Sequence, residues 1–360
     1  MAKFQFWLPT NLTRIQQRAV DSREPIFLSG VPGTGKTVVS IRRLQNAASL
    51  KKRAIIFTYG KLLKKTIEEK LENSIAMPVD NIHRWTWWIQ DQGQKKYLKD
   101  FLDDNNLPNA IGLLKSKQLY FDEILVDEGQ DFSINTYKLL REITASLSIS
   151  ADNAQRINNR KEATSEEEIR KLFPTLQSFE LDQIFRSAYE LYRFAIQFVP
   201  NNARANDPTL LERLKKENSG ADRPYVYLET NRDNMYNTIR DIIDENFMDN
   251  IGILFEKIEH IDEIESELSK DYEISAYHSK KSMPSELKNI IITTFKSAKG
   301  IEFDIVIIPY IDEGLRNVPE EYYVGATRAK SQVHFIAINE IPKIISHFDK
   351  STYRLVDNRG

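Results

Sequence analysis

The sequence of 360 residues contains no cysteine, which excludes disulfide bonds, thiolate metal sites and a cysteine nucleophile. It also has no uncharged apolar stretch of about 18–20 residues, the length that a membrane-spanning helix needs. The first residues contain no long apolar run, so we expect no signal peptide. These absences predict a cytoplasmic protein without a membrane partner.

Charge of one sign does not dominate either. The 50 Lys and Arg residues are balanced by 52 Asp and Glu residues, which gives a formal net charge of −2. This balance excludes a histone-like polycation, although it leaves room for a local basic groove. The 5 histidines show no metal-ligand spacing, which together with the missing cysteine argues against a zinc site.

Short apolar runs rich in β-branched residues alternate along the chain with longer stretches of helical period. Strands are predicted at 25–29, 54–58, 123–126, 147–150, 225–228, 251–255, 289–294, 305–309 and 333–338. Helices are predicted at 36–49, 61–72, 165–172, 187–198, 234–247 and 261–268, and the polar stretch 200–223 is predicted to be a surface connection. Such alternation is typical of parallel sheets covered by helices. Because the length exceeds a usual domain of about 100–200 residues, we expect an α/β fold of two domains, 1–178 and 179–360.

A glycine-rich segment directly follows the first predicted strand. It runs through Gly30, Val31, Pro32, Gly33, Thr34, Gly35, Lys36 and Thr37, and it fits the pattern G-x-x-x-x-G-K-[ST] in full. The glycines allow successive backbone N–H groups to point at phosphate oxygens, and the helix that begins at Lys36 adds the positive end of its dipole. We expect Lys36 to neutralise the β- and γ-phosphates of a nucleotide and Thr37 to ligate Mg²⁺.

Two adjacent carboxylates follow a later buried strand. The apolar run at 124–126 leads into Asp127 and Glu128. A P-loop site needs a carboxylate at the end of a neighbouring strand to hold the metal through water, and Asp127 suits that role. Glu128 suits the general base that orients the attacking water. The pair therefore predicts nucleotide hydrolysis rather than passive nucleotide storage.

Together with further motifs, these two segments occur in the order that is found in the UvrD/Rep type of superfamily 1 helicases. The resemblance covers nearly the whole chain. Residues 12–20 resemble the family's Q motif, which implies that Gln16 reads the adenine of ATP. Residues 127–131, Asp-Glu-Gly-Gln-Asp, match the family's D-E-x-Q-D form. Residues 151–155 resemble the motif whose glutamine, here Gln155, senses the γ-phosphate.

The second half carries three more motifs of this resemblance. In the first, Phe185 would stack on adenine and Arg186 would reach the γ-phosphate. In the second, Gly300 would approach the nucleotide and Glu302 would contact its ribose. In the third, Arg328 would complete the γ-phosphate clamp, where a guanidinium stabilises charge spread over three oxygens. The resemblance implies two RecA-like P-loop NTPase domains with ATP and Mg²⁺ in the cleft between them.

The resemblance also implies a nucleic-acid partner. Residues 56–59 and 82–84 resemble the two early motifs that touch the strand in the family. The candidate residues for this contact are Thr58, Tyr59, His83, Arg84 and Trp85. We expect ATP hydrolysis to be coupled to binding of, or translocation along, single-stranded DNA, and an RNA motor is an alternative.

Two departures from the family leave a further alternative open. Residues 90–120 are too short for the first accessory domain of the unwinding members, and residues 156–163 lack the aromatic residues that stack on bases. Stacking contributes about 1–3 kcal/mol per base to strand binding. The alternative is a nucleotide-gated, helicase-like subunit that regulates a partner, such as a nuclease in a defence or repair complex, without unwinding.

Overall fold

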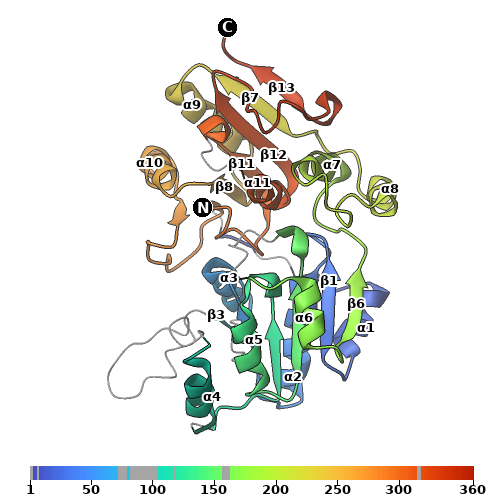
Figure 1. Ribbon diagram of the computed structural model, residues 1–360. Helices are drawn as coiled ribbons and strands as arrows, with labels where there is room; N and C mark the ends of the chain where they lie inside the picture. Colours follow the sequence, from blue (N-terminus) through green and yellow to red (C-terminus); the bar gives the residue numbers. More distant parts are fainter. Residues whose placement is uncertain are drawn as a thin grey trace. The chain divides into compact units, whose positions relative to one another are not determined.

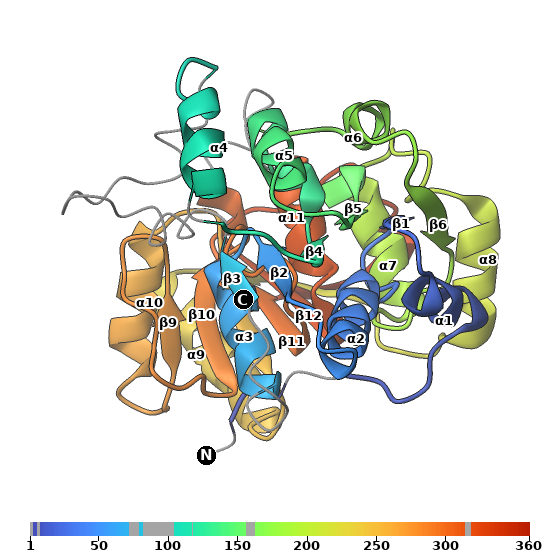
Figure 2. The ribbon, with the colours of Figure 1, turned by 90° about the horizontal axis from the view of Figure 1, so that it is seen from below.

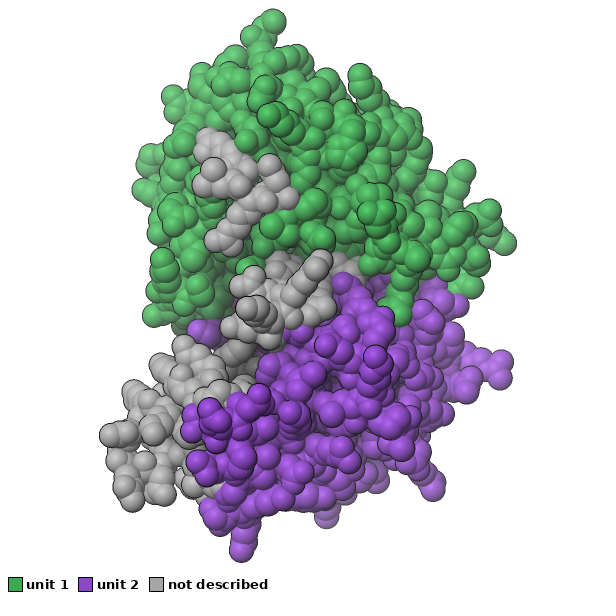
Figure 3. Space-filling view, viewed as in Figure 1, with its two compact units in different colours: residues 1–7, 183–360 green, residues 8–182 purple. Residues whose placement is uncertain are grey.

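A computed structural model describes residues 3–5, 8–71, 79–81, 104–116, 118–155, 163–313 and 318–360 (Figure 1). The chain forms two compact units, which Figure 3 shows in different colours. We call Leu8–Asp182 the N-terminal unit, and Gln183–Gly360 together with Met1–Trp7 the C-terminal unit. The division falls after Asp182 rather than after residue 178, because strand β6 (Gln177–Leu181) pairs with β1 (Ile26–Gly30) of the N-terminal unit.

The N-terminal unit contains a six-stranded sheet in the order β3-β2-β4-β5-β1-β6. Besides β1 and β6, its strands are β2 (Ala54–Thr58), β3 (Val79–Asn81), β4 (Glu123–Val126) and β5 (Leu147–Ala151). All of their pairings are parallel. Strands β1, β2, β4 and β5 are buried at every residue, which explains why β1, β2 and β4 appear in the sequence as mainly apolar runs.

Helices cover both faces of this sheet. The helices are α1 (Arg14–Asp21), α2 (Lys36–Ser49), α3 (Lys61–Leu71), α4 (Leu107–Ser116), α5 (Ile134–Arg141) and α6 (Glu166–Leu172). Residues of α4, α5 and α6 share one apolar cluster with the sheet, whereas α1 and α2 share another. Figure 2 shows α1 and α2 side by side next to β1.

A buried ion pair ties α2 to the strand that precedes the acidic pair. Arg43 Nη2 lies 2.8 Å from Glu123 Oε1, and both side chains are at least nine-tenths buried. Arg43 also donates hydrogen bonds to the backbone carbonyls of Ala19 and Ser22 at the end of α1. Since α2 starts in the glycine-rich loop and β4 ends directly before Asp127, this pair helps to fix the distance between the loop and Asp127.

The C-terminal unit contains a seven-stranded sheet in the order β13-β7-β12-β11-β8-β10-β9. Its strands are β7 (Tyr225–Glu229), β8 (Ile251–Phe255), β9 (Ser275–Tyr277), β10 (Ile290–Thr294), β11 (Phe303–Ile308), β12 (Ala329–Ile338) and β13 (Arg354–Asp357). These strands also pair in parallel. The predicted α/β fold with two parallel sheets, of the kind found in RecA-like domains, is confirmed.

The helices of this unit are α7 (Tyr189–Ala195), α8 (Pro208–Glu217), α9 (Arg232–Glu245), α10 (Glu259–Leu268) and α11 (Pro319–Ala326). Helices α9 and α10 pack on one face of the sheet through a cluster rich in isoleucine. Helices α7 and α11 contact β12 and β11, and an aromatic cluster that includes Phe194, Phe198 and Phe335 lies among them. No helix in the described ranges is both long and apolar enough to span a membrane.

The prediction of a surface connection at 200–223 was wrong in part, because α8 lies within it. Asp207 caps this helix by accepting a hydrogen bond from the Thr209 backbone N–H, and Pro208 stands at its first position. Both are typical helix-start residues. Within α8 only Leu210 and Leu214 are buried, so the helix packs through two apolar residues. Its apolar residues therefore show only a weak helical period in the sequence.

A buried histidine makes the stability of the C-terminal unit depend on pH. His334 on β12 stacks with Tyr225 at 5.2 Å and with Tyr227 at 5.9 Å between ring centres. Its Nδ1 lies 3.3 Å from the Tyr227 hydroxyl and its Nε2 lies 2.9 Å from Gln332 Oε1. A neutral ring protonated at Nε2 satisfies both contacts. Burial lowers the pKa of His334 from 6.5 to about 4.

We therefore expect His334→Phe to reduce the loss of stability in acid. Between pH 6.5 and about 4 the unfolded chain binds a proton that folded His334 does not, so stability falls as the pH drops through this window. The expected loss from this one group is about 2 kcal/mol or more by pH 4.5. Urea unfolding of both proteins at pH 7 and 4.5 measures it. Equal losses in the two proteins would contradict the prediction.

Candidate nucleotide site

The glycine-rich loop lies between β1 and α2, as predicted. A side chain at Gly30 would place its Cβ 2.6 Å from Thr34 Oγ1, and one at Gly35 would place it 2.5 Å from Gln16 Nε2. Gly35 also has a φ of +87°, in the left-handed region that favours glycine. As the N-cap of α2 it offers no capping side chain, so the first N–H groups of the helix remain for an anion.

The Lys36 ammonium group lies inside the loop. Its Nζ donates hydrogen bonds to the carbonyls of Gly30 at 2.6 Å and Val31 at 3.2 Å. It also lies 3.8 Å from the Asp152 carboxylate. The side chain is buried, so its charge acts in a region of low dielectric, where it attracts a phosphate more strongly than at the surface.

Gln16 lies against the same loop. Its Nε2 donates to the Thr34 carbonyl at 3.0 Å, and its Oε1 accepts from the Thr13 backbone N–H at 2.9 Å. Thr13 in turn caps α1 by accepting from the Gln16 backbone N–H. This reciprocal capping box fixes the glutamine at the start of α1. The structure therefore places the predicted adenine-reading residue in contact with the loop.

Asp127 follows β4 and meets two hydroxyl groups. Thr37 Oγ1 donates to its Oδ2 at 2.7 Å, and Ser150 Oγ donates to its Oδ1 at 2.5 Å. Burial, and next the neighbouring Glu128, raise the pKa of Asp127. The two hydroxyl groups and the charge of Lys36 oppose that rise because they stabilise the ionised carboxylate.

The donors present fit Mg²⁺. The described residues contain no group of three or more His, Cys, Asp or Glu side chains that could hold a metal ion by themselves. Mg²⁺ commonly takes one or two protein ligands and fills its octahedron with water and phosphate oxygens. The Thr37 hydroxyl and the Asp127 carboxylate, 2.7 Å apart at the loop, suit such a site. Thr37 and Asp127 would hold Mg²⁺ here, and the ion would neutralise negative charge on the phosphates of a nucleotide.

A buried polar network connects the remaining predicted residues of this unit. Gln130 Nε2 donates to Glu128 Oε2 at 2.6 Å, while its Oε1 accepts from the Asp152 backbone N–H at 2.9 Å. Gln155 Nε2 donates to Asp152 Oδ2 at 2.8 Å. All four side chains are at most 5% exposed. Since Asp152 also lies near Lys36, the network links Glu128 and Gln155 to the loop.

Sequence reasoning did not identify all of this site. Gln130 and Asp152 belong to motifs that the sequence shows, but their linking role depends on side-chain contacts. Ser150 belongs to a predicted buried strand, and nothing in the spacing distinguishes it from Ser148 two residues earlier. Only the pairing of β4 with β5 reveals that Ser150 meets Asp127.

A second group of predicted residues comes together in the C-terminal unit. The Arg186 guanidinium forms an ion pair with the Glu302 carboxylate and donates from Nη1 to the Thr327 carbonyl at 3.3 Å. Burial by itself would raise the pKa of Glu302, but the charge and hydrogen bond of Arg186 outweigh this effect. The pKa of Glu302 is therefore lowered, and the pair is ionised at neutral pH.

Arg328 lies beside this pair and is only 1% exposed. Its Nε donates to the Val324 carbonyl at 3.0 Å, and its charge contributes to the lowered pKa of Glu302. Gly300 is buried in a turn with a φ of +82°, two residues before Glu302. Phe185 is 39% exposed, so its ring is accessible to a ligand that would stack on it.

Of the candidate nucleic-acid residues, only Thr58 and Tyr59 lie within the described part of the chain. Thr58 is fully buried and donates to the Gly60 carbonyl at 3.1 Å. Tyr59 is half-buried, and its ring packs against Phe132 at 6.4 Å between ring centres. His83, Arg84 and Trp85 lie outside the described residues. The structure therefore brings the nucleotide candidates together within each unit, whereas it describes only Thr58 and Tyr59 of the strand-contact candidates.

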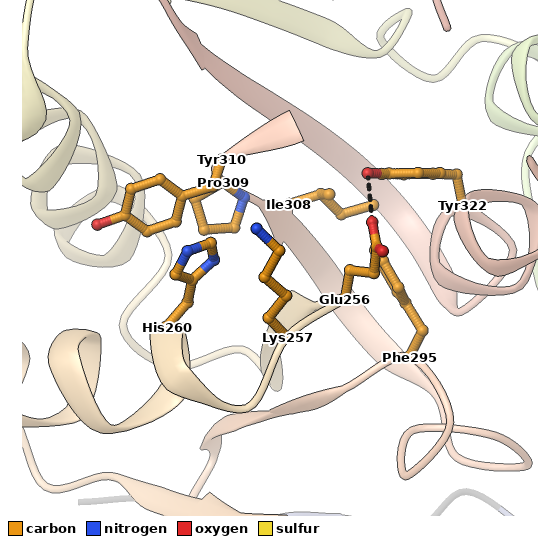
Figure 4. A pocket seen from close by; sticks show the side chains of 8 residues that line it. All are labelled: Glu256, Lys257, His260, Phe295, Ile308, Pro309, Tyr310 and Tyr322. Atoms are coloured by element: carbon orange, nitrogen blue, oxygen red, sulfur yellow. Dashed lines mark hydrogen bonds between the residues drawn. The ribbon is translucent and has the colours of Figure 1, made fainter. Parts of the chain in front are cut away.

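A small recess lies at the carboxyl ends of β8, β10 and β11 in the C-terminal unit (Figure 4). It is lined by Glu256, Lys257, His260, Phe295, Ile308, Pro309, Tyr310 and Tyr322. The Tyr322 hydroxyl donates to Glu256 Oε2 at 3.5 Å across it. The recess has room for about one water molecule, so we do not assign the nucleotide to it.

Comparison with known proteins gives one family match. Residues 15–159 match a family model described as an AAA domain, and this range includes every predicted site residue from Gln16 to Gln155. This part of the chain is therefore similar to domains of that family, and the match includes the glycine-rich loop and the acidic pair. A search of the curated proteins gives no match.

Among solved structures, the chain is similar to the C-terminal domain of a possible DNA helicase from Lactobacillus plantarum WCFS1. The identity is 16% and the TM-score is 0.38. The alignment covers 48% of this chain and 98% of that one.

Proposed function

We propose that this chain is a Mg²⁺-dependent ATPase, similar to UvrD-type helicases, that couples ATP hydrolysis to binding of or translocation along single-stranded DNA. The observation that carries the ATPase part is the set of contacts around the loop. Thr37 meets Asp127 at 2.7 Å, and the Gln130–Asp152 network joins Glu128 and Gln155 to Lys36. These are the groups that phosphoryl transfer to water requires.

In this proposal each residue of the N-terminal unit has one task. Lys36 and the loop N–H groups bind the phosphates, Gln16 contacts the adenine, and Gln155 senses the γ-phosphate. Glu128 orients the attacking water and accepts its proton, held in place by Gln130. Thr37 and Asp127 hold the metal, with Asp127 acting through a water molecule.

The C-terminal unit supplies the second half of the proposed site. Arg186 and Arg328 stabilise the charge that develops on the γ-phosphate, while Phe185, Gly300 and Glu302 contact the nucleoside. The ion pair between Arg186 and Glu302 supports this assignment, because it holds a guanidinium in a fixed orientation before any ligand arrives. Loss of the γ-phosphate then removes the anion that both arginines bind, which is the basis of an ATP-driven cycle.

The coupling to nucleic acid is tested by steady-state ATPase activity alone, with single-stranded DNA, and with single-stranded RNA. Glu128→Gln is the blank in every arm. We expect DNA to raise the rate about tenfold or more, because strand binding would favour the hydrolytic arrangement. Stimulation by RNA alone would instead identify an RNA motor. An ATPase rate that neither polymer changes, but that is lost in Glu128→Gln, would support the alternative of a subunit that regulates a partner such as a nuclease.

A further inference from the structure

Ser150 is a polar residue inside a strand that is buried at every position. It belongs to β5 and is 2% exposed. A buried hydroxyl group is unfavourable unless it forms a hydrogen bond. Its Oγ lies 2.5 Å from Asp127 Oδ1 and 3.4 Å from the Val126 carbonyl, so the carboxylate is its main acceptor.

The two oxygens of Asp127 are held from two different elements. Thr37 at the start of α2 donates to Oδ2, and Ser150 on β5 donates to Oδ1. Two hydrogen bonds on different oxygens fix the rotation of a carboxylate, whereas one leaves it free to turn. In the proposed site Thr37 also binds the metal. Of the two hydroxyl groups, Ser150 is therefore the one that contacts the Asp127 carboxylate and not the metal.

The backbone around Ser150 is held in a fixed position. A Cβ added at Gly129, in the turn after Glu128, would lie 3.0 Å from the Ser150 carbonyl oxygen and 2.6 Å from the Tyr137 hydroxyl. That hydroxyl, on α5, donates to the Gly129 carbonyl at 2.6 Å and ties the turn to this helix. The turn after Glu128 therefore packs closely against β5 at Ser150.

From this geometry we propose that Ser150 is a positioning residue that orients the Asp127 carboxylate for Mg²⁺. The proposal rests on the proposed function, because it assumes that Asp127 holds the metal. Groups that orient a metal-holding carboxylate through a hydrogen bond change metal affinity by about 10–100-fold when removed. Ser150 never touches the nucleotide in this role, so its effect reaches the metal only through Asp127.

The matched control is Ser148, on the same strand and, two residues away, on the same face. It is 3% exposed, and its Oγ accepts a hydrogen bond from the Ile26 backbone N–H at 3.2 Å. Ser148→Ala and Ser150→Ala thus remove the same buried atom from one strand. Ser150→Thr keeps the hydroxyl group, whereas Ser150→Val has the shape of threonine without the hydroxyl group. The Thr and Val variants answer the question if the alanine variant does not fold.

The test measures Mn²⁺ binding by electron paramagnetic resonance in the presence of ADP, where no turnover occurs, and the Mg²⁺ dependence of ATP hydrolysis. We expect Ser150→Ala and Ser150→Val to weaken Mn²⁺ binding about tenfold or more and to shift the Mg²⁺ requirement upward by a similar factor. Ser148→Ala and Ser150→Thr should stay within about threefold of the unaltered protein.

Two results would overturn the proposal while leaving the ATPase in place. One is that the unaltered protein binds Mn²⁺ and hydrolyses ATP and that the Ser150→Val variant does both equally well. The other is a Ser148→Ala variant that loses as much Mn²⁺ affinity as Ser150→Ala. An unaltered protein that neither binds Mn²⁺ with ADP nor hydrolyses ATP would overturn the proposed function and this inference together.

Discussion

Replacing Glu128 by glutamine is expected to lower the rate of ATP hydrolysis by about 10²–10⁴-fold while leaving ATP affinity nearly unchanged. Glutamine has almost the same shape but cannot accept the proton of the attacking water. Glu128 is 5% exposed and its Oε2 accepts from Gln130 at 2.6 Å, so the carboxylate is buried and contacts the polar network around the loop. Phosphate binding by the loop and Lys36 does not depend on it.

The measurement is single-turnover ATP hydrolysis beside equilibrium binding of a fluorescent ATP analogue. Lys36→Ala is the informative contrast, because it removes the buried cation of the loop and should lose both binding and hydrolysis. Glu128→Gln should lose hydrolysis alone. If that variant kept more than a tenth of the original rate, the base would have to be another group.

Replacing Arg186 by alanine is expected to lower ATP hydrolysis by about 10³-fold or more, the usual effect of removing an arginine that stabilises a phosphoryl-transfer transition state. The physical reason is that a guanidinium in a site of low dielectric offsets charge on several phosphate oxygens at once. Arg186 is suited to this because its side chain is 9% exposed and is oriented by Glu302 and the Thr327 carbonyl.

Arg193→Ala provides a control for this prediction in the same unit. Arg193 lies on α7, pairs with Asp349 at 2.7 Å and is 40% exposed, so its removal eliminates an ordinary surface ion pair. Pre-steady-state hydrolysis and thermal unfolding should be measured for both variants. A folded Arg186→Ala protein with the original rate would show that Arg186 does not take part in hydrolysis.

Most strands and the helix of the glycine-rich loop could be predicted from local sequence. Strands β2, β4 and β8 and helix α2 have the predicted bounds, because a fully buried parallel strand is a continuous apolar run and α2 begins at the glycine loop. Helix α8 could not be predicted, since only two apolar residues hold it. The unit boundary was misplaced for a related reason: β6 has an exposed, alternating pattern, and only its pairing with β1 assigns it to the N-terminal unit.

What the sequence determined by itself is a set of candidate residues for binding and hydrolysing a nucleotide. The loop from Gly30 to Thr37 and the pair Asp127–Glu128 are recognisable because phosphate and metal chemistry demands particular residue types at short spacings along the chain. The tertiary structure alone decided which groups hold these residues in place. Ser150 contacts Asp127, and Gln130 contacts the Asp152 backbone N–H, between segments that are 23 and 22 residues apart in the sequence, and no local pattern encodes such a contact. Hydrogen bonding and burial depend on distance in space, which only the folded sheet sets.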